Sequence, residues 1–433
     1  MRMSTTTRRA PIPGPGGIVG TNAPPFILPG QHFATALGFF LLGTLGLVWV
    51  APDLAQGLFP LPRVAGVTHL FTLGWLTTSI LGALYQFLPV ALGVPISSER
   101  WAHISFWLYA PGLVLFISGL VWHYPQVMLG GGFLFGIGLL VFVLNLGVTL
   151  VLARDRGLTW WALAGATLAL FATIGMGITL AVNLDWDFLG SGRFLVVGIH
   201  LHLALAGWVF LVVIGVAHRL LPMFLLSHGA PEWPGRVAAL FTGVGSLGLV
   251  FLYHGIPMSW AWILALLIGV GGVAFIYQAY LYFRYRVKKA LDPGLTLAGR
   301  AVVFLALGTG LAPIALGLGL TAPRIVVGYL TTLIIGGFSL FVVAHYYKIV
   351  PFLVWYHHFG HLAGRRPVPM VAELYDAGLA RTAVGFLSLG ALGLSTGILA
   401  GSPPLTRAAA VLLSAGAGLV VYQLFLVSKR RPE

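Results

Sequence analysis

The amino-acid sequence predicts an all-α, polytopic membrane protein with 12 transmembrane helices, arranged as three four-helix units around a pseudo-threefold axis. Three observations predict this fold. Of the 433 residues, 58% are hydrophobic and only 8% are charged, whereas a soluble domain carries about 25% charged residues. Twelve stretches are long and apolar enough to cross a bilayer, which takes about 20 residues. A motif recurs in every fourth stretch. This composition excludes a soluble enzyme and a disordered chain.

The predicted spans follow one another with short connections. They are 33–50, 67–90, 103–121, 127–152, 160–181, 195–222, 236–253, 259–283, 298–317, 325–352, 379–399 and 406–427. Residues 1–32 are rich in Pro and Gly and lack the apolar core of a cleavable signal peptide, so we interpret them as a cytoplasmic N-terminal tail. Residues 33–428 then form a single transmembrane domain, followed by a basic cytoplasmic tail at 429–433.

The distribution of basic residues predicts the orientation of the spans. With the N-terminus inside, only Arg63, Arg193, Arg324 and Arg407 of the 24 Lys and Arg residues face outward. Cytoplasmic loops are enriched in Lys and Arg, so we expect a multi-pass protein of the cytoplasmic (inner) membrane with both termini in the cytoplasm. This topology and contact with membrane lipid explain the net charge of +14 without a nucleic-acid partner.

Two absences from the sequence limit the chemistry of any site. The chain has no cysteine, which excludes disulfides, iron–sulfur clusters and thiolate metal sites. None of its ten Asp and Glu residues lies deep in a predicted span, whereas ion-coupled transporters usually bury such acids. A metal centre would therefore draw on the 13 His residues. A transporter is disfavoured, although repeats of Gly-rich helices also occur in that class.

A motif recurs in the second, sixth and tenth predicted spans. The copies begin at His69, His202 and Thr331, about four spans apart. Each has a Gly five residues and a Pro twenty residues after its start, at Gly74, Gly207, Gly336, Pro89, Pro222 and Pro351. Twenty helical residues rise about 30 Å, a full bilayer, so the starts lie near the outer face. Chance matching in a Gly-rich chain is the alternative, but the equal spacing favours three related four-helix units.

Two of the repeat starts are histidines in the outer half of the membrane. Neutral imidazole is a common haem ligand, and two His residues from different helices make a six-coordinate site. We therefore predict that His69 and His202 bind a haem b. His200 is turned about 200° away from His202 on the helix, and we pair it with His254 as a candidate site for copper or another second metal. The alternative for each is a packed, hydrogen-bonded histidine without a ligand.

Three of the four outward-facing cations stand just before the repeat starts. Arg63, Arg193 and Arg324 precede their starts by six to nine residues. Arg binds carboxylates through two parallel hydrogen bonds, and haem carries two propionates. We therefore predict that these residues take part in cofactor binding. Anchoring to lipid headgroups is the alternative.

Twelve spans with outer-half His residues on the second and sixth resemble subunit I of the haem–copper oxidase superfamily. That superfamily includes oxygen reductases and nitric oxide reductases, and the related NnrS-type membrane proteins are linked to haem, copper and nitric oxide. The resemblance implies that His69 is the low-spin haem ligand of the second span. It also implies that His200 or His202 is a copper ligand, with His254 on the span that carries further copper ligands.

The sequence departs from the superfamily pattern in the tenth span. The superfamily has His-x-His there, whereas this chain has Tyr329 and Thr331, and its own His-x-His is His200 and His202 on the sixth span. A haem between the second and sixth spans is therefore our inference from the internal repeat, and the superfamily does not supply it.

These observations lead to one principal hypothesis and two alternatives. The principal hypothesis is a haem-binding membrane protein that handles electrons or a diatomic gas, nitric oxide or oxygen. As an enzyme it would be a haem-dependent oxidoreductase supplied with electrons by quinol or by cytochrome c. The alternatives are a non-catalytic haem or nitric oxide-response protein, and a transporter or channel without haem. Homo-oligomers and partner subunits both remain open.

The inner half of the sixth and tenth spans holds two further histidines. His218 and His345 lie near Tyr85, Tyr346 and Tyr347 in the repeat alignment. They suit a quinol pocket or a second metal site. Hydrogen-bonded anchors at the membrane interface are the alternative.

Overall fold

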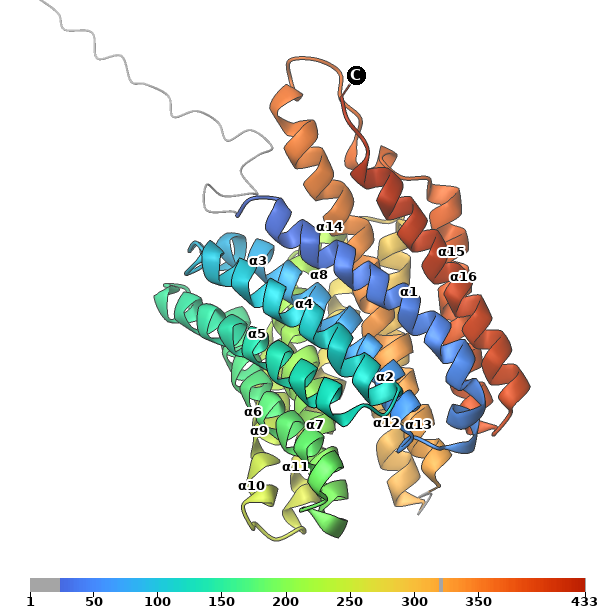
Figure 1. Cartoon of the computed structure of the whole chain (residues 1–433). Coiled ribbons are helices and arrows are strands. Elements are labelled where there is room, and N and C mark those ends of the chain that lie inside the picture. Colours follow the sequence, from blue (N-terminus) through green and yellow to red (C-terminus); the bar gives the residue numbers. More distant parts are fainter. Residues whose placement is uncertain (1–23, 319–321, 433) are drawn as a thin grey trace, which may run out of the picture.

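The computed structural model describes residues 24–318 and 322–432, and in this part of the chain it is a bundle of helices without a β-strand (Figure 1). Twelve of its helical spans are long and apolar enough to cross a membrane. The prediction of an all-α, multi-pass membrane protein with 12 spans is therefore confirmed. Residues 1–23 of the predicted tail lie outside the described residues, and helical structure already begins at Ile27.

Within residues 24–318 and 322–432, nine spans contain no π-helical segment. Their helices are α1 (Ile27–Gln56), α4 (Glu99–Val121), α5 (Pro125–Leu152), α6 (Leu158–Trp186), α9 with α10 (Trp233–Gly248 and Val250–Tyr253), α11 (Trp260–Arg284), α12 (Pro293–Gly317), α15 (Ala377–Leu399) and α16 (Pro403–Ser428). Because the spans are even in number, α1 begins and α16 ends at the same end of the bundle, called the termini side below. The opposite end is called the far side.

The second, sixth and tenth spans, called the central spans below, each consist of two α-helices separated by a π-helical segment. They are α2 (Pro62–His69) and α3 (Thr78–Leu92), α7 (Arg193–His202) and α8 (Leu211–Leu225), and α13 (Pro323–Thr331) and α14 (Leu340–His358). The π segments between them are Leu70–Thr77, Leu203–Phe210 and Thr332–Ser339, each of eight residues.

The π segments have the same register in all three copies of the repeat. Each begins one residue after the repeat start, that is after His69, His202 and Thr331. π-helical turns are rare and often occur at functional sites. An identical register in three separate spans supports the equivalence of the central spans that the sequence repeat predicts.

Proline and glycine set many of the helix ends. Pro62, Pro125 and Pro403 stand in the first turn of their helices, where a backbone N–H is not needed for the helical ladder. Gly57 and Gly93 end α1 and α3 in the left-handed conformation, with φ of 75° and 66°. Glycine adopts this conformation without steric cost, so the chain can turn sharply between neighbouring spans.

The repeat glycine allows each central span to approach the span that precedes it. A Cβ atom added at this glycine would lie only 2.4–2.7 Å from a side chain of that preceding span. The contacts are Gly74 with Phe39 of α1, Gly207 with Ala169 of α6, and Gly336 with Phe304 of α12. The same pairing therefore recurs three times along the chain.

The three central spans also contact one another. One contact is a hydrogen bond from Trp208 Nε1–H to Thr77 Oγ1 at 3.1 Å, and another joins Ser79 and Tyr346 through their hydroxyls at 2.8 Å. The rings of Phe210 and Phe338 lie 5.9 Å apart. Each pair of central spans is thus joined by a buried contact, so the three surround a common axis. Their assembly with the other nine spans into three four-helix units stays a prediction.

A charged cluster fastens the start of α12 to α14 on the termini side. Asp292 accepts hydrogen bonds from Lys288 Nζ at 2.8 Å and from Lys348 Nζ. Its other oxygen accepts the backbone N–H of Leu295 at 3.0 Å, as an N-cap does. Burial alone would raise the pKa of Asp292, but the hydrogen bonds from the two lysines hold this pKa below its ordinary value.

Because Asp292 is paired with two lysines, we expect the folding stability of the protein to depend on pH. The pKa of Asp292 in the folded protein lies below the unfolded value of about 3.9. The contribution of ionised Asp292 to the free energy of unfolding is therefore complete above about pH 3.9 and is lost as the pH falls through the folded-state pKa. Asp292→Asn keeps the hydrogen-bond acceptor and removes the charge. We expect the melting temperature of native protein to exceed that of Asp292→Asn near neutral pH, and the difference to shrink below about pH 4. A difference that does not change with pH would contradict this role.

Candidate haem and metal site

His69 and His202 have the same position and the same hydrogen bond in their spans. Each is the last α-helical residue before its π segment. The Nδ1–H of His69 donates to the carbonyl of Ala65 at 2.7 Å, and the Nδ1–H of His202 donates to the carbonyl of Gly198 at 2.8 Å. Both hydrogen bonds leave the Nε2 lone pair available. This is the tautomer that a metal-ligating histidine uses when its other nitrogen donates to a carbonyl.

The third copy shows that this histidine is not required by the fold. Thr331 occupies the equivalent position, and a π segment of the same length follows it. The imidazoles of His69 and His202 therefore do not serve to form the π segment. Both side chains are half-buried, and the His69 ring packs edge-on against Phe116 with 5.3 Å between the ring centroids.

His200 points in a different direction from His202. Its Nδ1–H donates to the carbonyl of Thr173 on α6 at 3.2 Å, whereas His202 bonds within its own helix. A Cβ atom added at Gly177 of α6 would lie 3.1 Å from His200 Cε1. The structure thus presents His69 and His202 in equivalent positions, whereas His200 is bonded to a neighbouring span.

His254 is exposed, whereas the other three predicted histidine ligands are half-buried. It follows α10 in an exposed loop, and in the described part of the chain its ring contact is with Tyr253, at 5.5 Å between centroids. Among the described residues, no group of three or more His, Asp or Glu side chains is placed to hold a metal ion. The pairing of His200 with His254 as a copper site stays a prediction.

Two of the three predicted arginines make contacts within the chain. Arg63 binds the carboxylate of Asp53 through both Nε and a terminal nitrogen, each at 2.7 Å. Its carboxylate-binding side is therefore already occupied. Arg193 has one longer ion pair, at 3.6 Å to Asp187, and lies over the ring of Phe194. Because this ion pair is exposed and long, Arg193 is more available to a ligand than Arg63.

Arg324 lies at the far side, where two turns approach it. A Cβ atom added at Gly401, in the turn between α15 and α16, would lie 3.1 Å from a terminal nitrogen of Arg324. A Cβ atom at Gly57 would lie 2.6 Å from its backbone nitrogen. The residue is exposed. It is available to a carboxylate or to a lipid phosphate.

Two fully buried histidines outside the predicted site each have one nitrogen without a partner. His32 on α1 is wholly buried, and its Nδ1–H donates to the carbonyl of Leu28 at 2.8 Å. His345 on α14 makes the same kind of bond to the carbonyl of Phe341, also at 2.8 Å. In both, Nε2 is buried without a hydrogen-bond partner in the described chain. The sequence marked His345 by its place in the repeat, whereas no pattern distinguished His32.

Comparison with known proteins finds similarity among solved structures only. No family model and no curated protein matches the sequence. Among solved structures, the chain is similar to a structure described as a heme-copper terminal oxidase dimer, with a TM-score of 0.68 and 14% sequence identity. The match covers 94% of this chain and 85% of that chain. The chain therefore has a haem–copper oxidase subunit I-like fold, and the expectation drawn from the sequence resemblance is confirmed for the fold.

Proposed function

We propose that this membrane protein, which has the fold of a haem–copper oxidase chain, binds a haem b in its far half and handles electrons or a diatomic gas, nitric oxide or oxygen. One observation carries the proposal. His69 and His202 stand at equivalent positions at the start of two π segments, and each has Nδ1 tied to a backbone carbonyl and Nε2 left available. This is the donor set that axial ligation requires.

The residues of the chain have two tasks in this proposal. The Nδ1–H bonds to Ala65 and Gly198 fix the ring orientation and make Nε2 a better donor. Arg193 and Arg324 are the cations best placed to receive propionates, since Arg63 is paired with Asp53. When bound, the haem would supply an iron that takes up and releases one electron. His200 is the competing partner of His69, because it stands two residues before His202 and also has Nδ1 bonded to a carbonyl.

A second metal has less support than the haem. His200 also has Nδ1 bonded to a carbonyl, which leaves its Nε2 available, but His254 lies in an exposed loop and no third His, Asp or Glu among the described residues completes a metal site. The proposal therefore includes no copper chemistry. Quinol and a partner cytochrome c remain the proposed electron donors, and the termini are proposed to face the cytoplasm because the basic residues gather on their side. Oligomers or partner subunits are proposed because the similar oxidase was described as a dimer.

The test is the haem and metal content of the detergent-purified chain from haem-replete cells. We expect a Soret band, an α-band in the reduced-minus-oxidised spectrum, and b-type haem by pyridine haemochrome. Elemental analysis for copper distinguishes a haem protein from one with a second metal. A colourless preparation would contradict the proposal and favour a transporter or channel. A coloured preparation that reduces neither oxygen nor nitric oxide would favour the non-catalytic haem or nitric oxide-response protein.

A further inference from the structure

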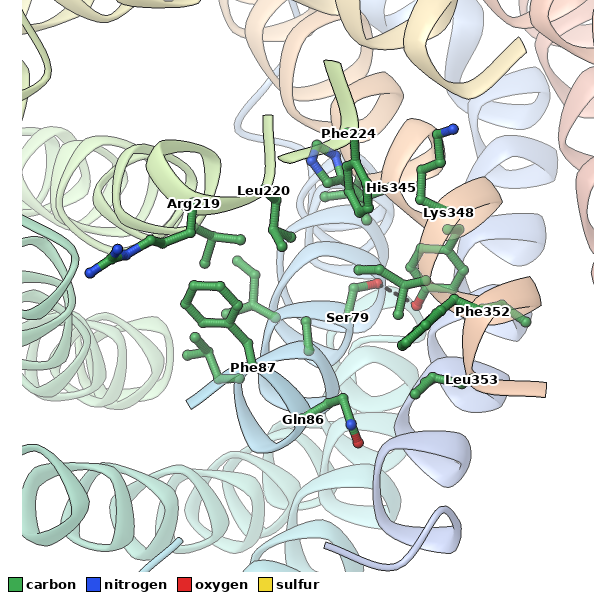
Figure 2. Close-up of a pocket in the computed structure, with 18 of the residues that line it drawn as sticks. Ser79, Gln86, Phe87, Arg219, Leu220, Phe224, His345, Lys348, Phe352 and Leu353 are labelled. Carbon is green, nitrogen blue, oxygen red and sulfur yellow. Dashed lines mark hydrogen bonds between the residues drawn. The ribbon is translucent and has the colours of Figure 1, made fainter. Parts of the chain in front are cut away.

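A cavity of about 610 Å³ lies between the three central spans, in their termini-side halves (Figure 2). It is lined mainly by α3, α8 and α14, with Phe33 and Val371 from elsewhere in the chain, and lies on the other side of the π segments from His69 and His202. Cavities of this size are typical of small-molecule sites, which measure about 300–1,000 Å³. This cavity is therefore large enough for a ligand and separate from the proposed haem site.

The three copies of the internal repeat contribute equivalent residues to the wall of the cavity. Seven positions of the repeat line it, and each is contributed by all three central spans. Most of these side chains are apolar, so the walls suit a lipid-soluble molecule. The hydrogen bond between Ser79 and Tyr346 lies at the cavity wall (Figure 2). Val90 and Met223 belong to the lining and are 43% and 45% exposed, so the cavity is open to the surroundings of the bundle.

The cations of the lining do not form an anion site. One repeat position contributes Gln86, Arg219 and Lys348. Arg219 donates to the carboxylate of Asp155 at 3.0 Å, and Lys348 donates to that of Asp292. Because each cation already has a carboxylate within the chain, the electrostatics favour a neutral ligand.

His345 offers the cavity a hydrogen-bond acceptor. Its side chain is 8% exposed and belongs to the lining, and its ring packs against Phe341 and Phe224 (Figure 2). Since Nδ1–H donates to the carbonyl of Phe341, Nε2 carries the lone pair. This atom is buried without a partner in the described chain. Buried polar atoms in folded proteins are nearly always hydrogen bonded. A ligand that donates a hydrogen bond would supply the partner that Nε2 of His345 lacks.

The repeat provides an internal control for this histidine. Ala83 and Val216 occupy the position equivalent to His345 on α3 and α8, and both line the same cavity. Two of three copies therefore use a small apolar residue where the third buries an imidazole. Packing alone does not require a histidine here.

Gln86 supplies a second unpartnered acceptor. Its Oε1 is buried without a hydrogen bond in the described chain, and the side chain lines the cavity at a point well separated from His345 in Figure 2. An apolar cavity with two buried acceptors and no free cation selects for a ligand with hydroxyl donors.

We infer that this cavity binds a neutral, lipid-soluble phenol or alcohol whose hydroxyl donates a hydrogen bond to Nε2 of His345. Quinols, which the sequence suggests as electron donors, fall within this class. The ligand needs no charge, because the cations are paired, and it needs an apolar body to fill the repeat-lined walls. The inference does not depend on haem binding at His69.

The test uses para-decylphenol and its methyl ether, which differ in the hydroxyl hydrogen that the acceptor requires. Binding is measured by calorimetry on the full-length, detergent-solubilised chain. We expect the phenol to bind about tenfold more tightly than the ether, the effect of one hydrogen bond. His345→Val introduces the residue found at the equivalent Val216, and it should lower phenol affinity to that of the ether and leave the ether affinity unchanged. Val216→Ala is the matched control and should keep the preference.

Three outcomes would overturn the inference: no binding of either compound, equal binding of both to native protein, or a preference that survives in His345→Val. Haem content is measured on the same preparations. A colourless protein that still prefers the phenol would keep this inference and reject the proposed function. A haem-containing protein that shows no preference for the phenol would reject this inference and keep the proposed function.

Discussion

His69→Thr is expected to remove the haem spectrum from the purified protein while leaving the fold intact. Threonine is the natural residue at the equivalent start of the third repeat, Thr331, and a π segment of the same length follows it there. The change therefore removes an imidazole without a known cost to the local backbone. We expect haem per chain to fall by more than the roughly 10- to 100-fold that a change behind a metal ligand produces. The measurement is the Soret absorbance per folded chain.

Parallel variants identify the partner of His69. His202→Thr tests the symmetric pair that the sequence predicts, and His200→Thr tests the other histidine of α7. Only the variant that removes the second ligand should reduce haem content to the same extent. His361→Ala, in the exposed loop after α14, is the control and should keep the native spectrum. An unchanged spectrum in His69→Thr would reject the ligand assignment.

Gly336→Val should lower the thermal stability of the protein more than any change on the lipid-facing surface. A Cβ atom at this position would lie 2.4 Å from the ring of Phe304 on α12. The near end of a phenylalanine ring cannot move aside cheaply. Overpacking of this kind typically costs about 1–3 kcal/mol. The measurement is the melting temperature of the detergent-solubilised protein.

Two further variants separate the clash from the change of residue type. Gly418→Val places the same side chain on α16, where an added Cβ atom would have no atom within 4 Å, and should leave the melting temperature nearly unchanged. Phe304→Ala combined with Gly336→Val should recover part of the loss, because the double variant removes the clash. Additive effects of Phe304→Ala and Gly336→Val would show that the close contact is not the cause.

The repeat links these experiments. In every copy a π segment begins one residue after the repeat start, and the repeat glycine contacts the preceding span. What differs between copies is the chemistry: histidine at two starts and threonine at the third, and histidine at only one of three equivalent cavity positions. Comparison of copies within one chain thus separates residues required for packing from those available for function.

Two features of the structure could not be predicted from any single segment of the sequence. The π segments are mostly apolar, like the rest of their spans, and only their coincidence with the repeat could have indicated them. The cavity on the termini side arises where three spans meet, so no one span shows it. Aligning the three copies would have placed Gln86, Arg219 and Lys348 on a common surface, but not the ion pairs that occupy two of them.

The sequence alone determined that this chain has 12 membrane spans and three related central ones. Both properties are local, because span length is set by bilayer thickness and the repeat by spacing along one helix. Tertiary structure alone decided that His200 donates its Nδ1–H to a carbonyl of α6, and that Arg63 is paired with Asp53. The physical reason is that lipid and protein neighbours are equally apolar, so the residue pattern of a span carries little information about which side faces a partner.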